Sequence, residues 1–142
     1  MRIAVSADEL TGVAEALPDE LRRRGHEPLL HGAYDDSERP DWAWASEAAA
    51  RDVADGRADQ AIVACWTGTG ASIAANKVAG IRAALCSDAQ TADGARKWND
   101  ANVLVMGLRL TTADTAHEML DAWFATDPEA SERDNIDRLE AR

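Results

Sequence analysis

Short apolar runs alternate along the chain with longer segments in which apolar residues recur every three or four positions. Five of the short runs are typical of strands: RIAVSA at 2–7, HEPLLH at 26–31, QAIVAC at 60–65, GIRAALC at 80–86 and NVLVMG at 102–107. The run at 60–65 is apolar almost throughout, which is typical of a strand covered on both faces. Pro28 lacks a backbone N–H, so we expect the run at 26–31 near a sheet edge.

The segments between these runs have the periodicity of helices. Helices are predicted over 12–24, 41–56, the segment after the glycines at 68–70, 89–97, the segment around 116–124, and the charged tail from 129 onward. In the second of these, Asp41 is expected to cap the helix, and Trp42 to lie with Ala45 on a stripe that faces the core. Strands that alternate with helices predict a five-stranded parallel, Rossmann-like sheet in a three-layer α/β/α sandwich, formed by a single domain over residues 1–142.

The composition narrows the range of partners. A chain of 142 residues is long enough for one domain with its own core, and it carries a net charge of −11. Nucleic acids and anionic membrane surfaces are therefore excluded as partners, because a protein that binds either of them needs a basic surface. There is no signal-peptide pattern and no apolar segment of membrane-spanning length, so we expect a cytoplasmic protein. An anionic substrate has to be held by a few arginines that act against the overall field.

A glycine-rich turn joins the third predicted strand to the next helix, in AIVACWTGTGASIAANK at 61–77. Cys65 closes the strand, and ligands of parallel sheets bind outside the carboxyl ends of the strands. The backbone N–H groups of 67–70 then begin a helix, and free N–H groups at a helix N-terminus bind anions. A thiolate beside them suits a general base.

Two other interpretations of this turn stay open on the residues alone. Cys65 can be a buried structural thiol, as we expect for Cys86, and the two cysteines have neither disulfide nor metal-ligand spacing. The turn can also bind a dinucleotide, since Gly68, Gly70 and Asp88 match part of that fingerprint. The dinucleotide motif, however, follows the first strand of its fold, and this turn follows the third.

Two longer stretches, CWTGTGASIAANKVAGIRAALCSD at 65–88 and KWNDANVLVMGLR at 97–109, carry a more specific pattern. Through them the chain resembles the ribose-5-phosphate isomerase B family, which includes the galactose-6-phosphate isomerase subunits, over nearly its whole length. The family patterns are C-G-T-G-x-G-x-S-x-A-A-N-K and H-N-D-x-N followed by a strand and an arginine. The resemblance implies an aldose–ketose isomerase of a sugar phosphate, of the ribose 5-phosphate to ribulose 5-phosphate type. It implies a cis-enediol mechanism with no metal and no organic cofactor.

The resemblance also implies a role for each matching residue around the turn. Cys65 matches the base that moves a proton between C1 and C2 of the open-chain sugar. Thr67 and the backbone amides of Gly68, Thr69 and Gly70 match the groups that bind the oxygen of the enediolate. Such a set is chemically sufficient, because isomerisation needs one base and donors aimed at the developing oxyanion.

The remaining matches are with residues that hold the substrate. The resemblance implies that Asp8 and Asn99 contact the sugar. It also implies that the phosphate is bound by Arg109, Arg133 and Arg138. Family members are dimers or tetramers in which the C-terminal segment of one subunit completes the active site of its neighbour. We therefore expect a homodimer or a dimer of dimers, with the C-terminal helix at 128–142 packed on a partner subunit.

The chain departs from the family pattern at several positions that are expected to lie near the substrate. Glu9 stands where the family has a histidine, Trp66 replaces a glycine, and Trp98 replaces the histidine that opens the sugar ring. An indole N–H can donate a hydrogen bond but cannot exchange a proton at neutral pH. Glu9 and Trp98 are still expected to lie at the substrate. Two alternatives stay open: an isomerase of a shorter or modified sugar phosphate, and a non-catalytic relative that binds sugar phosphates.

Overall fold

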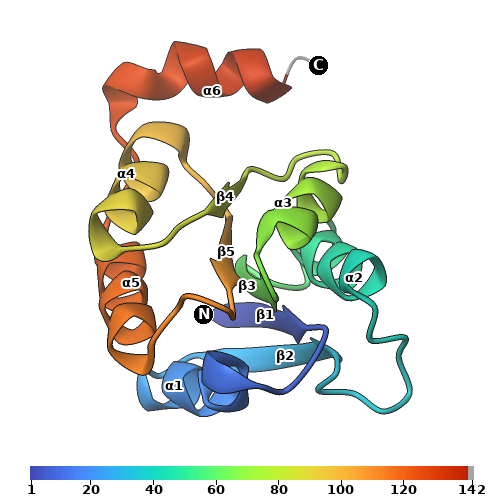
Figure 1. Cartoon of the computed structure of the whole chain (residues 1–142). Helices are drawn as coiled ribbons and strands as arrows, with labels where there is room; N and C mark the ends of the chain where they lie inside the picture. The colour runs from blue at the N-terminus through green and yellow to red at the C-terminus, as the bar shows by residue number, and fades with distance from the viewer. Residues whose placement is uncertain (141–142) are drawn as a thin grey trace.

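A five-stranded parallel sheet forms the centre of the protein. In the computed structural model, which describes residues 1–140, its strands are β1 (Arg2–Ala7), β2 (Glu27–Gly32), β3 (Gln60–Cys65), β4 (Ala83–Leu85) and β5 (Val103–Gly107). Their order is β2-β1-β3-β5-β4, and every neighbouring pair is parallel. The expected three-layer α/β/α sandwich is confirmed, and β2 lies at a sheet edge as its proline predicted (Figure 1).

Helices cover both faces of this sheet. They are η1 (Gly12–Glu15, a 3-10 helix), α1 (Leu17–Arg23), α2 (Trp42–Ala54), α3 (Thr69–Asn76), α4 (Ala89–Asn99), α5 (Ala113–Ala125), η2 (Ala130–Glu132, a 3-10 helix) and α6 (Arg133–Glu140). In Figure 1, α2 and α3 lie on one face of the sheet and α1, α4 and α5 on the other. Within residues 1–140, no helix is both long enough and apolar enough to cross a membrane.

One helix prediction is wrong in its bounds. The helix expected over 12–24 is split into η1 and α1, with Pro18 in the first turn of α1. A proline has no N–H and its ring clashes with the preceding turn, so it is tolerated at the start of a helix but not in its interior. Of the C-terminal segment expected as a helix over 128–142, the structure describes η2 and α6 up to Glu140. Residues 141 and 142 lie outside the described part of the chain.

The fourth strand is shorter than the sequence indicated. β4 begins at Ala83, because the chain still turns at Gly80 (φ +83°) and the Arg82 N–H donates to the side chain of Asn102 at 2.8 Å. The Asn76 side-chain amide donates to the Ala83 carbonyl at 3.0 Å, and its oxygen accepts from the Ala83 N–H at 2.9 Å. A side chain thus pairs with this sheet edge where a further strand would.

The buried side chains differ in size on the two faces of the sheet. Under α1, α4 and α5 the core contains large residues, among them Leu17, Leu21, Met119, Leu120 and Trp123. Under α2 and α3 it consists mainly of alanine and valine, with Cys65 among them. Small side chains allow a helix to pack closely on a sheet, so the residues under α2 and α3 permit a closer approach than those under α1, α4 and α5.

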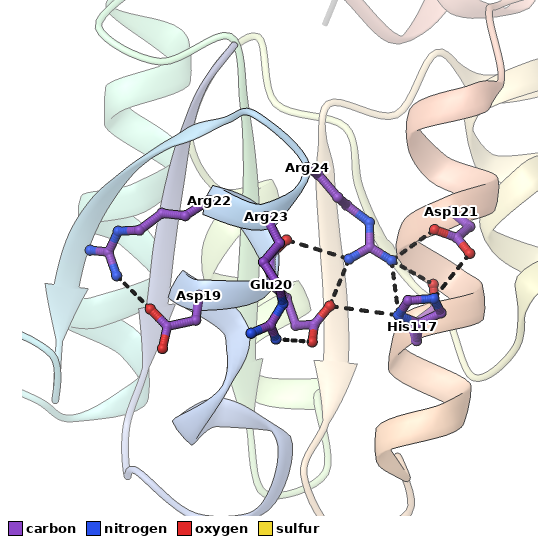
Figure 2. A network of polar contacts seen from close by, with 7 residues as sticks. All are labelled: Asp19, Glu20, Arg22, Arg23, Arg24, His117 and Asp121. Carbon is purple, nitrogen blue, oxygen red and sulfur yellow. Dashed lines mark hydrogen bonds and ion pairs between the residues drawn. The ribbon is translucent and has the colours of Figure 1, made fainter.

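A polar network links α1 to α5 on the face with large side chains (Figure 2). The guanidinium of Arg24 donates to Glu20 at 2.7 Å, to Asp121 at 2.7 Å and to the carbonyl of His117 at 3.2 Å. The end of α1 leads directly into the start of β2. This network therefore lies towards the amino ends of the strands, opposite the end at which Cys65 is found.

Candidate active site

The strand order reverses between β1 and β3. From β1 the chain adds β2 on one side and then returns to place β3 on the other, with Ala7 beside Ala64. In open α/β sheets, ligands bind in the crevice outside the carboxyl ends of such a strand pair. Asp8 follows β1 directly and Cys65 ends β3, so both residues belong to this crevice.

A hollow of about 330 Å³ opens at this point of the sheet. We call it the Cys65 hollow, and its lining comes from the end of β1, the start of α2 and the turn between β3 and α3: Asp8, Trp42, Cys65, Trp66, Thr67, Thr69 and Gly70. Most of the residues that the sequence placed around the turn, together with Asp8 from a distant part of the chain, therefore line one space.

Cys65 is held in a fixed position at the end of β3. Its carbonyl accepts from the Leu108 N–H at 2.9 Å, and the carbonyl of Trp66 accepts from the Arg109 N–H at 2.8 Å. These bonds extend the pairing of β3 with β5 beyond both strands. Cys65 is only 5 % exposed, so its thiol is approached through the hollow and not from the open surface.

The turn between β3 and α3 requires glycine at one position. Gly68 has φ +78°, and a Cβ there would lie 2.5 Å from Leu85 Cδ1 and 3.1 Å from the Gly107 nitrogen. α3 then starts at Thr69 without a side-chain cap. Since the first N–H groups of a helix have no partner inside it, those of Thr69 and Gly70 are available beside the thiol for a developing negative charge.

Trp42 forms one wall of the hollow, and the expectation that it lies in the core is wrong. It is the first residue of α2 and is 47 % exposed, whereas Ala45, one turn later, is buried. Its ring packs on Gly70, because a Cβ on that glycine would lie 2.9 Å from Trp42 Cε3. Asp41 occupies the expected N-cap position but makes no capping hydrogen bond, since its carboxylate pairs with Arg39.

The periodicity of α2 identified the correct face of the helix. It could not show that the first turn of α2 extends past the end of the sheet. One signal that could have indicated this is the polar loop that directly precedes Trp42 in the sequence.

Asp8 is a carboxyl group without a full set of partners. Its Oδ1 is buried, and it has no hydrogen-bond partner among residues 1–140. Burial raises the pKa of the Asp8 carboxyl above its usual value, and the negative charges of Glu9 and Asp41 raise it further. An unpaired buried acceptor typically costs about 1–3 kcal/mol, so a hydroxyl donated by a bound ligand would stabilise this group.

Glu9 and Arg109 lie beside the hollow and do not line it. Glu9 is exposed. Arg109 lines a second, smaller hollow of about 80 Å³, which shares Trp66 and Thr67 with the Cys65 hollow. Arg109 is therefore a neighbour of the thiol across the wall formed by these two residues.

The other predicted site residues are not gathered around Cys65 within one chain. Trp98 and Asn99 line a different hollow, of about 470 Å³, between α4 and β4. Arg133 and Arg138 are exposed on α6, where Arg133 donates to Asp137 at 2.9 Å. These four residues are not among those that line the Cys65 hollow within one chain.

The residues that supported the dinucleotide interpretation have local structural partners. Asp88 caps α4 by accepting from the Thr91 N–H at 2.7 Å, so its carboxylate is already engaged. Cys86 is buried, and burial, followed by the charge of Asp88, raises the pKa of its thiol to about 11. In the described part of the chain, no three His, Cys, Asp or Glu side chains are grouped so that they could hold a metal ion.

Comparison with known proteins gives consistent matches. The family described as Ribose/Galactose Isomerase matches residues 3–140. Ribose-5-phosphate isomerase B of Escherichia coli (strain K12) is 43 % identical over 104 residues, which are 73 % of this chain and 69 % of that protein. D-erythrulose-4-phosphate isomerase of Pectobacterium atrosepticum is 34 % identical over 87 % of this chain and 82 % of that protein. The solved structure of Clostridium thermocellum ribose-5-phosphate isomerase B superposes with a TM-score of 0.91 at 31 % identity, over 99 % of this chain and 96 % of that one.

Proposed function

The chain belongs to the ribose/galactose isomerase family, and on that premise we propose that it is an aldose–ketose isomerase of a sugar phosphate. The observation that carries the proposal is the Cys65 hollow. It combines a thiol, a carboxyl group with one unpaired buried oxygen and the free N-terminal end of α3. This is the minimum that proton transfer next to a carbonyl requires: a base, and donors for the oxyanion.

In the proposed reaction the Cys65 thiolate removes the proton from C2 of the open-chain aldose. The electron pair forms the C1–C2 double bond of the enediolate, and the former carbonyl oxygen takes the negative charge. Thr67 and the amides of Gly68, Thr69 and Gly70 stabilise that oxygen. The thiol then returns the proton to C1 while a proton moves from O2 to O1, which gives the ketose and restores the thiolate.

The remaining groups hold the substrate. Asp8 accepts from a sugar hydroxyl, which supplies the partner that its buried Oδ1 lacks. Arg109 binds the phosphate from the adjoining hollow. A guanidinium is well suited to this role because it binds phosphate through two parallel hydrogen bonds, even on a protein with a net charge of −11.

We further propose that the working form is at least a homodimer. Four tryptophans are about half exposed, which is unusual for so large an apolar side chain: Trp42, Trp44, Trp66 and Trp98. In a dimer, Asn99 and Trp98 of one chain would face the Cys65 hollow of the other. The C-terminal helix of a partner would add Arg133 and Arg138 as phosphate contacts. A monomer by light scattering at assay concentration would contradict this part of the proposal.

Within the substrate class, we propose that a four-carbon sugar phosphate is converted faster than ribose 5-phosphate. Ribose 5-phosphate is mostly a closed ring in water, and Trp98 stands where the family has its ring-opening histidine. An aldose 4-phosphate cannot form the usual furanose, because the hydroxyl that would close it is esterified. One of the relatives is named as a D-erythrulose-4-phosphate isomerase, so the family includes a member named for a four-carbon substrate.

The test is a panel of tetrose, pentose and hexose phosphates, assayed for conversion between aldose and ketose. We expect kcat/KM for erythrose 4-phosphate to exceed that for ribose 5-phosphate. A kcat/KM for ribose 5-phosphate of roughly 10⁴ M⁻¹s⁻¹ or more, above that of the tetrose, would contradict the four-carbon preference but not the isomerase.

A second candidate is a sugar-phosphate-binding protein without turnover. It is favoured by one observation, the replacement of two family histidines by Glu9 and Trp98. Calorimetric binding of sugar phosphates together with no conversion of any of them would support this candidate over the isomerase.

A further inference from the structure

His31 lies between two carboxylates. Its Nδ1 is 2.8 Å from Glu38 Oε1, and its Nε2 is 2.6 Å from Asp52 Oδ2. An ionised carboxylate can only accept hydrogen bonds, so both ring nitrogens must donate. An imidazole that donates from both nitrogens carries a proton on each, and His31 is therefore an imidazolium in this arrangement.

The outer oxygens of both carboxylates are paired as well. Glu38 Oε2 accepts from the Gly32 N–H at 2.9 Å, and Asp52 Oδ1 accepts from Arg57 Nε at 2.7 Å. The side chains of His31, Glu38 and Asp52 are only 16 %, 29 % and 9 % exposed. The set is thus a complete, partly buried network in which every carboxylate oxygen has a donor, and we call it the His31 clamp.

The clamp joins three separate elements. His31 belongs to β2, Asp52 to the last turns of α2, and Glu38 to the loop 33–41 between them. The other side chains of 36–41 bond only nearby: Ser37 to Asp35, and Arg39 to Asp41 with its guanidinium 3.6 Å from the Trp44 ring. Glu38 is therefore the side chain that ties this part of the loop to the sheet and to α2; Figure 1 shows the loop extending away from the body of the protein.

The loop leads directly into the wall of the Cys65 hollow. Asp41 is its last residue, and its negative charge helps to raise the pKa of Asp8 in the hollow. Trp42 follows, with its ring packed on Gly70 at the start of α3. The place of the loop thus sets both one wall of the hollow and part of its electrostatic field.

We propose that protonated His31 is a positioning residue for the active site: it anchors the loop through Glu38 and keeps Trp42 packed on Gly70. When His31 loses its proton, one of the two bonds must be lost, the loop loosens, and substrate binding weakens. The effect on substrate rests on the proposed isomerase function, whereas the effect on the loop does not.

The charges around His31 set the direction of the pH dependence. Burial by itself disfavours the imidazolium, but the hydrogen bonds to Asp52 and Glu38 and the charges of both outweigh it, so the pKa of His31 is raised above its usual value. Asp35 also faces His31 from the loop, and Arg57 acts through Asp52. The clamp is consequently closed at a pH below this raised pKa and opens as the pH rises through it.

The first experiment measures KM against pH for the wild type and for His31→Gln. We expect the wild-type KM to rise about fivefold relative to the variant as the pH increases, with kcat changing in parallel in the two proteins. The comparison with the variant removes the titration of the substrate phosphate and of the catalytic thiol. His117→Gln is the matched control, because His117 also lies between two carboxylates, at 3.6 and 3.4 Å, but on α5 far from the hollow. A constant ratio of the two KM values over the pH range would overturn the effect on substrate binding.

The second experiment needs no substrate and no variant. The His31 ring is followed by NMR against pH, and amide hydrogen exchange of residues 33–42 is measured over the same range. We expect the ring to titrate above the ordinary histidine value of about 6.5, and exchange of the loop, corrected for its intrinsic pH dependence, to accelerate with the same midpoint. If the exchange rate of the loop does not change with that titration, the proposed role of the clamp is wrong. If no sugar phosphate is converted but the exchange follows the titration, the proposed function has failed and the clamp has not.

Discussion

The two faces of the sheet divide stability and chemistry between them. The face covered by α1, α4 and α5 buries the large side chains, including Trp123, Leu120 and Met119. The face covered by α2 and α3 buries alanines and valines, and it carries Cys65, Trp42 and the start of α3. Apolar area is the main source of folding free energy, so the first face contributes most of it. The proposed active site, which needs close contact between a helix and the strand ends, lies on the other face.

Small residues make that closeness possible. A Cβ on Gly32 would lie only 2.6 Å from the Cβ of Ala45, so α2 already touches the end of β2. Gly70 leaves room for the ring of Trp42 in the same way. Larger side chains would lift α2 and α3 away from the strands, and the N–H groups of α3 would no longer lie beside the thiol.

The strongest way to test this division is to remove the thiol. Cys65→Ala should lower kcat by about 10²–10⁴-fold, the usual contribution of a general base, while the free energy of unfolding changes by about 1 kcal/mol. Steady-state kinetics and urea denaturation measure the two quantities. Cys86→Ala is the control, a buried cysteine in the core of the other face, which should retain activity. Substantial turnover by Cys65→Ala would exclude the proposed mechanism.

The second test removes a large side chain from the face covered by α1, α4 and α5. Leu120 is fully buried in α5, and Leu120→Ala should reduce the free energy of unfolding by about 2–5 kcal/mol through lost burial and a cavity. The folded fraction of the variant should keep its kcat. Ala75→Gly in α3 is the comparison on the small-residue face, with an expected cost of about 1 kcal/mol. Equal losses from the two substitutions would show that stability is not divided as proposed.

A subtler change tests the contact between Trp42 and Gly70. A methyl group at Gly70 would lie 2.9 Å from the Trp42 ring, and that ring stands at an exposed wall from which it can swing away. Gly70→Ala should therefore lower kcat/KM by about tenfold with little loss of stability, because the wall of the hollow is displaced. In the background of Trp42→Ala the same substitution should have no further effect. A tenfold loss in both backgrounds would point to a direct effect on the helix N-terminus.

The smallest effect is a difference in pH response between the faces. The raised pKa of His31 means that its contribution to stability is complete below the unfolded value of about 6.5 and is lost as the pH rises through the folded value. Hydrogen bonds from Arg23 and then Arg24 lower the pKa of Glu20, so its contribution is present above its unfolded pKa and is lost as the pH falls. His31→Gln should flatten the alkaline side of the stability profile, and Glu20→Gln should flatten the acid side. The midpoints of urea denaturation, measured across the pH range, test both expectations. A flattened acid side in His31→Gln, or a flattened alkaline side in Glu20→Gln, would contradict them.

The sequence predicted the elements whose signals are local. Each strand contains a short apolar run, and the thiol at 65 followed by a glycine turn indicated the carboxyl end of a strand, where ligands of parallel sheets bind. The split at Pro18 was also readable in principle, because a proline is tolerated only near the start of a helix, but the apolar periodicity over 12–24 is that of one continuous helix.

Features that depend on distant partners could not be predicted in this way. His31 meets Glu38 and Asp52, which are 7 and 21 positions away, and nothing in the local pattern indicates that these three side chains meet. Asn99 belongs to the motif at 97–109, and its match in the family contacts the sugar. Within one chain, however, it lines a hollow other than the Cys65 hollow. A single sequence gives the residue types of a site more readily than it gives the subunit from which each one comes.

The side chain of Asn76 bears on how this protein avoids aggregation. Edge strands of a sheet expose unpaired backbone groups that can recruit a strand from another molecule. At β4 the Asn76 amide already occupies the N–H and the carbonyl of Ala83, in the manner of a one-residue strand. At the opposite edge, Pro28 in β2 has no N–H to offer. Both edges of the sheet are thus poor templates for further strands. This disfavours fibrous aggregation of the protein at high concentration.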